Sequence, residues 1–171
     1  TIRGSMRLAA LVTVLIISHL LSAPASAQQR QNPSPMVETA RRHERFAEQS
    51  PAGKRLPLSL GTLLMPARRN ALLIVHFHGP QWLAELSARR AFADAAVLSV
   101  QAGVSSDPYS QALAPPGRFE QLMEEAESAA GQKFPRVVLS SFSAGYGATR
   151  EILRDPANHA RIQAVVFADS M

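Results

Sequence analysis

The sequence predicts an α/β protein with a mostly parallel sheet and helices on both faces. Short apolar runs rich in β-branched residues alternate along the chain with stretches whose apolar residues recur at helical spacing. Strands that alternate with helices in this way are joined as parallel neighbours by right-handed crossovers, and the helices cover both faces of the sheet. A second observation is the apolar run 137–139, which leads directly into the small residues of 140–147 and then into a helical pattern. A strand, a sharp turn and a helix are the expected result.

The first predicted elements are two strands and a helix. Residues 58–65 predict a strand that ends at Pro66, because proline cannot continue the hydrogen bonding of a strand. Residues 71–77 form a nearly continuous apolar run, which is typical of a strand buried on both faces. Residues 81–91 place their apolar side chains on one side of a helix.

The remaining elements continue the alternation. Residues 119–130 predict a helix, since their apolar side chains recur at i, i+3, i+4 and i+7 and Gly131 follows as a C-terminal cap. Residues 101–117 are rich in Gly, Ser, Asp and Pro and predict a long loop. Further strands are expected over 95–100, 136–141 and 162–168, and a further helix over 144–153.

The N-terminal part of the chain has the pattern of a secretory signal. Met6 and Arg7 supply a start and a positive charge, residues 8–21 are mostly apolar, and an A-x-A site ends at Ala27. The apolar stretch is short for a membrane span. We therefore expect cleavage after Ala27 and a secreted or periplasmic protein, whose only membrane contact would be an uncleaved signal segment. An uncleaved N-terminal anchor is the alternative.

Length and composition leave room for one folded domain. Residues 1–27 hold upstream residues and the signal, residues 28–57 are polar and weakly patterned, and the domain is expected over 58–171. The 18 Lys and Arg and 13 Asp and Glu residues are spread along the chain, which argues against a nucleic-acid partner. The chain has no Cys, which excludes disulfides, a thiolate nucleophile and a Cys-based zinc site.

Ser143 is the candidate nucleophile. It follows the strand 136–141 at the apex of the predicted turn, where a hydroxyl stands clear of the backbone. The N–H groups of the following helix 144–153 then point at the atom that the hydroxyl attacks. Small residues, Ser141 and Gly145, flank the apex two positions away on each side. Two alternatives remain open: a turn that serves packing alone, or one that holds a phosphate at the helix N-terminus.

The order of these elements resembles the first two-thirds of an α/β-hydrolase, over about residues 58–171. The match depends on a strand followed by His78-Gly79 and on a later strand followed by Ser141-x-Ser143-x-Gly145. The family's usual first glycine of that motif is Ser141 here. The resemblance implies a serine hydrolase that acts on a small-molecule or polymer ester, or less often an amide, without a cofactor. It also implies that the two strands are neighbours in the sheet.

The resemblance implies an oxyanion site built from two backbone N–H groups. Ala144, the residue after the serine, supplies one donor. The family's other donor follows the His-Gly dipeptide, but that position is Pro80 here, which has no N–H. Gly79 or Gln81 is then the candidate donor. For the side chain of His78, anchoring the loop is favoured over proton transfer.

Two further features lie near this predicted site. His76 and His78 form a His-x-His pair that could bind a metal, but no second cluster of ligands accompanies the pair, so no metal site is expected. The loop 101–117 follows a strand at the same edge of the sheet and is a candidate for shaping a substrate pocket.

The resemblance also suggests a catalytic acid and implies that the catalytic base is absent from residues 1–171. Asp169 follows the strand 162–168 and is the candidate acid, with a helix N-cap as its alternative role. The family's catalytic histidine follows the last strand, whereas His159 precedes the strand 162–168 and would lie at the opposite edge of the sheet. We therefore expect an N-terminal fragment, C-terminally truncated before the catalytic histidine. A catalytically silent binding protein of the same fold is the alternative function.

Overall fold

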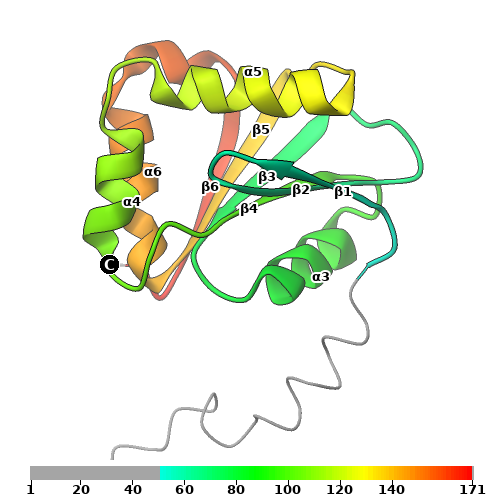
Figure 1. Cartoon of the computed structure of the whole chain (residues 1–171), viewed down its shortest axis with the longest axis horizontal. Coiled ribbons are helices and arrows are strands. Elements are labelled where there is room, and N and C mark those ends of the chain that lie inside the picture. Colours follow the sequence, from blue (N-terminus) through cyan, green and yellow to red (C-terminus); the bar gives the residue numbers. More distant parts are fainter. Residues whose placement is uncertain (1–50, 171) are drawn as a thin grey trace, which may run out of the picture. The chain divides into compact units, whose positions relative to one another are not determined.

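The structure, a computed structural model, describes residues 51–170, and these form a mixed sheet flanked by helices (Figure 1). The strand order is β1-β2-β4-β3-β5-β6. Strands β4, β3, β5 and β6 are parallel, and β1 and β2 join them as antiparallel neighbours at one side. The strands are β1 (Lys54–Leu58), β2 (Gly61–Met65), β3 (Leu72–Phe77), β4 (Ala96–Val100), β5 (Arg136–Phe142) and β6 (Ile162–Ala168). The mostly parallel α/β sheet expected from the sequence is confirmed.

Helices cover both faces of this sheet. Figure 1 shows α3 on one side and α4, α5 and α6 on the other. The helices are α3 (Gln81–Ala91), α4 (Ser106–Leu113), α5 (Arg118–Ala130) and α6 (Tyr146–Arg154), with short 3-10 turns η2 (Ser143–Gly145) and η3 (Pro156–Ala160). Helix α5 ends as predicted at Gly131, whose φ of 62° is in the left-handed region that suits a glycine cap.

Strand β3 shows why the apolar run 71–77 predicted burial on two sides. Its alternate residues Leu73 and Val75 belong to the main core, together with Phe119 and Leu122 of α5. Leu72 and Ile74, on the other face of the strand, pack with Ala88 of α3 in a smaller cluster. Because side chains alternate between the faces of a strand, a strand between two helical layers needs apolar residues at nearly every position.

Two strands replace the single strand predicted over 58–65. Strands β1 and β2 form a hairpin, and the sheet begins at Lys54, upstream of the predicted start of the domain at residue 58. The turn has no Asn-Gly or Asp-Gly pair to mark it, but Gly61 is needed there. A Cβ at Gly61 would lie 2.1 Å from the carbonyl oxygen of Ser99 in β4. Pro57 is tolerated in β1 because β1 is an edge strand.

Helix α4 lies within the segment 101–117 that the sequence predicts as a loop. Pro108 belongs to its first turn, where a missing N–H removes no helical hydrogen bond. Tyr109 and Leu113, four residues apart, are both buried against the core. The sequence did not predict this helix, because the segment is rich in Pro and Gly and a helix of eight residues buries only one pair of large apolar side chains.

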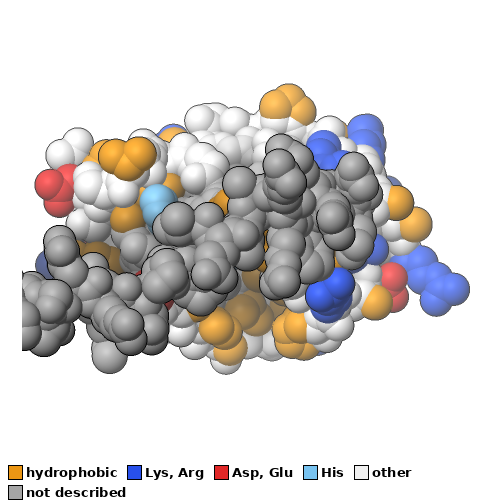
Figure 2. Space-filling model, turned by 90° about the horizontal axis from the view of Figure 1, so that it is seen from below, with side chains coloured by type: hydrophobic (Ala, Val, Ile, Leu, Met, Phe, Trp, Pro, Cys, Tyr) orange, Lys and Arg blue, Asp and Glu red, His pale blue; other side chains and the backbone are white. Residues whose placement is uncertain are grey.

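On the face of the molecule that carries α3, the described residues in view form no continuous basic patch (Figure 2). Figure 2 shows that face, with Lys and Arg side chains standing among neutral and apolar ones. Within 51–170 no helix has the length and apolar character needed to cross a membrane. The predicted signal segment and most of the polar segment 28–57 lie outside the described residues.

Candidate active site

Ser143 lies at the apex of a sharp turn between β5 and α6. Its φ of 44° is in the left-handed region that non-glycine residues rarely adopt. Strain of this kind persists only where the surroundings enforce it, and it is concentrated at functional sites. The side chain is half-buried, and among residues 51–170 its hydroxyl has no hydrogen-bond partner. The turn therefore presents an unengaged hydroxyl at the carboxyl end of a parallel strand.

The neighbouring small residues let α6 approach the sheet and α4 closely. A Cβ at Gly145 would lie 2.2 Å from the carbonyl oxygen of Phe77, at the end of β3. A Cβ at Gly147 would lie 2.5 Å from the carbonyl oxygen of Ser106 in α4. Any larger side chain at these two positions would push Ser143 and α6 away from their neighbours.

The loop of residues 78–80, called here the His-Gly loop, lies beside the Ser143 turn. Strands β3 and β5 are parallel neighbours, as the resemblance implied, so their carboxyl ends meet. The ring of His78 stacks on Phe142, the residue before Ser143, with 6.1 Å between ring centroids. Its Nδ1 atom is 3.1 Å from the hydroxyl of Tyr109. The imidazole of His78 thus packs between β5 and α4.

The backbone of the His-Gly loop turns sharply and is held by hydrogen bonds. His78 and Gly79 both have positive φ, 72° and 98°. The N–H of His78 donates to the carbonyl of Val100, 3.2 Å away. The carbonyl of His78 lies 2.7 Å from Nε2 of His76, and the carbonyl of Gly79 accepts a hydrogen bond from the side chain of Gln101. The loop is therefore held by Val100 at the end of β4, by Gln101 just after it, and by His76 of its own strand β3.

Gln81 points its side chain elsewhere. It begins α3, and its Nε2 donates to Glu85 at 2.7 Å, one turn along the same helix. Glu85 is buried and also pairs with Arg55 of β1. Among the residues predicted for this site, Gln81 therefore directs its side chain along α3, where it binds Glu85 and does not face Ser143.

Ser143 and Asp169 line the same hollow, although β5 and β6 bring them there from separate loops. The hollow has a volume of about 240 Å³ and is lined by Ser106, Ser143, Ala144, Tyr146 and Asp169. Asp169 is exposed and has a φ of 51°, so it is a third non-glycine residue in the left-handed region at this edge of the sheet, with His78 and Ser143. Ala144 belongs to the first helical turn, where N–H groups lack partners within the helix.

A pair of buried serines joins the ends of β5 and β6. The hydroxyl of Ser141 donates to the hydroxyl of Ser170, and the Ser170 hydroxyl lies 3.0 Å from the carbonyl of Ser141 and 2.9 Å from that of Ala168. Both side chains are buried. Ser170 directly follows Asp169, so this contact holds the Asp169 turn beside the Ser143 turn. A glycine in place of Ser141 would lack that hydroxyl.

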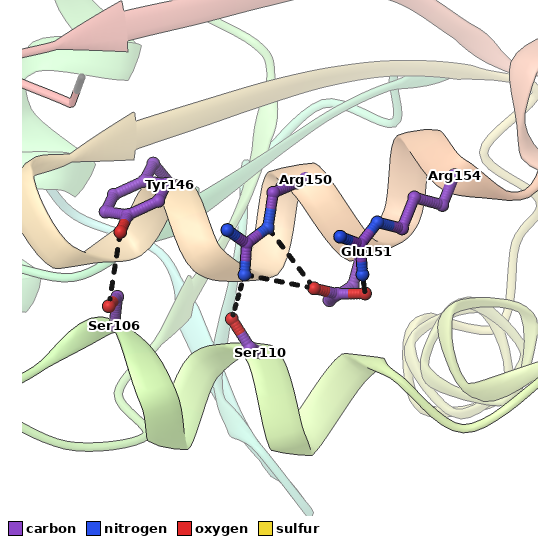
Figure 3. A network of polar contacts seen from close by, with 6 residues as sticks. All are labelled: Ser106, Ser110, Tyr146, Arg150, Glu151 and Arg154. Atoms are coloured by element: carbon purple, nitrogen blue, oxygen red, sulfur yellow. Dashed lines mark hydrogen bonds and ion pairs between the residues drawn. The ribbon is translucent and has the colours of Figure 1, made fainter.

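Helix α4 forms one wall of the hollow and is tied to α6 by polar contacts (Figure 3). The hydroxyl of Tyr146 donates to Ser106 at 3.4 Å, and Arg150 donates to Ser110 at 3.2 Å. The guanidinium of Arg150 also lies 5.7 Å from the centre of the Tyr146 ring. The sequence singled out the segment 101–117 for shaping a pocket, but nothing in it identified Ser106 as the residue that reaches the hollow.

No histidine among residues 51–170 is hydrogen-bonded to Ser143. His159 lies in η3, before β6, and its Nε2 is 3.0 Å from the carbonyl of Leu153. The imidazoles of His76 and His78 have the partners given above. His19 and His43 lie outside the described residues. The described part of the chain also contains no group of three or more His, Cys, Asp or Glu side chains that could hold a metal ion.

His76 is half-buried, and its hydrogen bonds hold the ring in one tautomer. Burial lowers the pKa of His76 below its ordinary value, by more than its hydrogen bond to the His78 carbonyl raises it. A carbonyl oxygen only accepts, so Nε2 of His76 carries the proton in the bond to His78. Nδ1 of the neutral ring then accepts from the hydroxyl of Ser140, 3.0 Å away.

Comparisons with known proteins find likeness to solved structures only. No protein-family model matches the chain, and no curated protein matches it. The Francisella virulence factor BioJ is 12% identical with a TM-score of 0.49, and the match covers 77% of this chain and 49% of BioJ. Esterase 2 of Thermogutta terrifontis is 14% identical with a TM-score of 0.45, covering 69% of this chain and 56% of the esterase. Carboxylesterase CesB of Bacillus subtilis is 17% identical with a TM-score of 0.40, covering 75% and 49%.

The chain spans about half the length of the solved structures that it matches. The identities are low and the TM-scores lie below 0.5, so the description of the fold depends on the topology of this chain. In this topology the His-Gly loop follows β3, the left-handed Ser143 follows β5, and these two strands are parallel neighbours, as the resemblance to α/β-hydrolases implied.

Proposed function

We propose that this α/β-hydrolase-like protein is a serine hydrolase that cleaves esters, or less often amides, through an acyl-enzyme on Ser143. The observation that carries the proposal is the left-handed conformation of Ser143 together with its unengaged hydroxyl, which lines a hollow shared with Asp169. Backbone strain is concentrated at functional sites, and a strained turn that exposes a serine hydroxyl is the arrangement by which hydrolases present a nucleophile to a carbonyl carbon.

The proposed chemistry begins with Ser143. Its oxygen attacks the carbonyl carbon of the ester, and its proton passes to a histidine located outside residues 51–170. The carbonyl oxygen becomes an oxyanion that accepts from the N–H of Ala144 and from a donor of the His-Gly loop. The histidine returns the proton to the leaving alcohol. Water then releases the acid from the serine by the same steps, with Asp169 as the carboxylate that orients the imidazole.

A fluorophosphonate probe tests this proposal on the protein produced from its complete gene. We expect covalent modification of wild-type protein at Ser143, located by peptide mass spectrometry. Ser143→Ala should abolish labelling, while Ser128→Ala, a matched change at an exposed site on α5, should not. A folded wild-type protein that the probe does not modify overturns the proposal.

A catalytically silent binding protein is the second candidate. Pro80 removes one backbone donor from the His-Gly loop, and no described imidazole is bonded to Ser143; both observations favour this alternative. It predicts no labelling, together with thermal stabilisation by esters or acids that fit the hollow. If inorganic phosphate raised the melting temperature of wild type and Ser143→Ala alike, a phosphate site at the start of α6 would explain the turn instead.

Secretion belongs to the proposal as well. Residues 1–27 have the pattern of a cleaved signal, and the expected mature protein begins at Gln28. Intact-mass measurement of protein recovered from the periplasm or medium tests this. A mass that retains residues 8–21 in a membrane fraction would favour the N-terminal anchor.

A further inference from the structure

Few polar backbone groups of the His-Gly loop are left unpaired. The N–H of His78 donates to Val100, its carbonyl accepts from His76, and the carbonyl of Gly79 accepts from Gln101. Pro80 has no N–H. The N–H of Gly79 is the remaining donor, and among residues 51–170 it has no hydrogen-bond partner. A backbone N–H is seldom left unpaired unless water or a ligand takes it.

The bond from His76 determines the direction of this N–H. No cis peptide occurs among the described residues, and in a trans peptide the C=O and N–H point in opposite directions. Because Nε2 of His76 holds the carbonyl of His78 at 2.7 Å, the N–H of Gly79 is turned away from the imidazole of His76. A peptide flip, to which a glycine at a positive φ is prone, would break that bond.

The His-Gly loop packs against the residue before Ser143, so the direction of the Gly79 N–H bears on the environment of the serine. A Cβ added at Gly79 would lie 3.6 Å from the ring of Phe142, the residue before Ser143. The ring of His78 stacks on the same phenylalanine. Gly145, on the other side of Ser143, packs against the backbone of Phe77. The end of β3 and the serine turn therefore form one packed unit.

We infer that the N–H of Gly79 is the second oxyanion donor and that His76 is a positioning residue, which orients this donor through the His78–Gly79 peptide. The inference rests on the proposed function and assigns the donor that Pro80 cannot supply. Ser140 has a supporting role, because its hydroxyl donates to Nδ1 and keeps the proton of the neutral ring on Nε2. Two residues of the sheet would thus set the direction of one catalytic N–H.

The test uses two substitutions of His76 that differ in reach. Glutamine can place an amide nitrogen near the position of Nε2, whereas asparagine reaches only as far as Nδ1 and leaves the His78 carbonyl without its partner. In the protein from the complete gene we expect His76→Asn to lower kcat for 4-nitrophenyl acetate by about 10- to 100-fold with little change in KM, since loss of one oxyanion donor costs about 100- to 1,000-fold. His76→Gln should recover most of this loss.

An inhibitor that forms an oxyanion supplies a readout that general destabilisation would not produce. An aryl trifluoromethyl ketone adds to the serine and places a negative oxygen in the oxyanion site. Its Ki should rise in His76→Asn by about the factor by which kcat falls. The matched control is His159→Asn, which removes another imidazole–carbonyl bond at the amino end of β6, remote from the hollow. We expect it to change neither constant.

The outcomes separate this inference from the proposed function. If wild-type protein neither reacts with the fluorophosphonate nor hydrolyses the ester, the proposed function fails, and the inference with it. If wild type is active and His76→Asn keeps its kcat and Ki, the inference alone is overturned. Equal losses in His76→Asn and His76→Gln, or a loss in KM alone, also overturn it, because they indicate that His76 fills space rather than orients a peptide.

Discussion

The hydroxyl of Ser141 donates to the hydroxyl of Ser170 across the ends of two neighbouring strands, with 3.2 Å between the oxygens. The first residue lies in β5, two positions before Ser143, and the second follows Asp169. Both are buried, so the contact is protected from water. Ser141 stands where α/β-hydrolases usually have a glycine, and its hydroxyl connects the strand before the proposed nucleophile to the residue after the proposed acid.

Removing one hydroxyl of this pair should be costly. Ser170→Ala leaves the Ser141 hydroxyl buried without that partner, and an unsatisfied buried polar group costs about 1–3 kcal/mol. We expect a loss of that size in the free energy of unfolding, measured by urea denaturation. Ser128→Ala, at an exposed site, should stay within about 0.5 kcal/mol of wild type. A Ser170→Ala protein as stable as wild type would show that the contact contributes nothing.

The left-handed conformation of Ser143 should lower the free energy of unfolding of the protein. A non-glycine residue in the left-handed region costs about 1–2 kcal/mol that glycine avoids. Ser143→Gly should therefore be more stable than Ser143→Ala by about 1 kcal/mol, although both lose the hydroxyl and neither reacts with the fluorophosphonate. Thermal denaturation of the two variants makes the comparison. If alanine were the more stable of the two, the turn would hold no such strain.

Gly145 should tolerate no side chain. The Cβ of alanine would meet the Phe77 carbonyl oxygen at 2.2 Å, and forced overpacking costs about 1–3 kcal/mol. Gly131 is a suitable comparison, because an added Cβ meets nothing within 4 Å there and only its φ of 62° is unfavourable. We expect Gly131→Asn, which tolerates that φ, to unfold near the wild-type temperature and Gly145→Ala well below it.

Glu127 should make stability depend on pH in the acidic range. Burial raises the pKa of Glu127, but the hydrogen bonds from Lys133 and the N–H of Phe134 and the nearby charge of Arg161 outweigh it and hold the pKa below its ordinary value of 4.5. The folded state therefore binds this proton less readily than the unfolded state. The resulting stability is present above the unfolded pKa and is lost as the pH falls through the folded value.

Glu127→Gln removes the titrating group and keeps the shape. We expect a shallower fall in melting temperature than wild type as the pH is lowered from about 5 to about 3. Glu124→Gln, on the exposed side of the same helix, is the control and should leave the profile unchanged. Parallel profiles for wild type and Glu127→Gln would contradict the assignment.

The sequence predicted features that local physics decides. The alternation of apolar runs and helical patterns indicated the α/β class, and residues 136–147 indicated a strand, a tight turn and a helix, because apolar spacing and small residues act within a few positions. The split of 58–65 into two strands and the helix within 101–117 escaped prediction. In each case tertiary contact decided: Gly61 packs on the backbone of Ser99, and Tyr109 is buried in the core.

The relations between distant residues were decided by the tertiary structure alone. The amino-acid sequence placed Ser143, His78 and Asp169 at the ends of strands. Strand order then brought the His-Gly loop against Phe142 and opened one hollow to Ser143 and Asp169. The strand order also decides which backbone groups of the His-Gly loop form hydrogen bonds, and therefore that the N–H of Gly79 has no partner among residues 51–170. Those pairings bring together groups more than twenty residues apart, whose contacts no local pattern encodes.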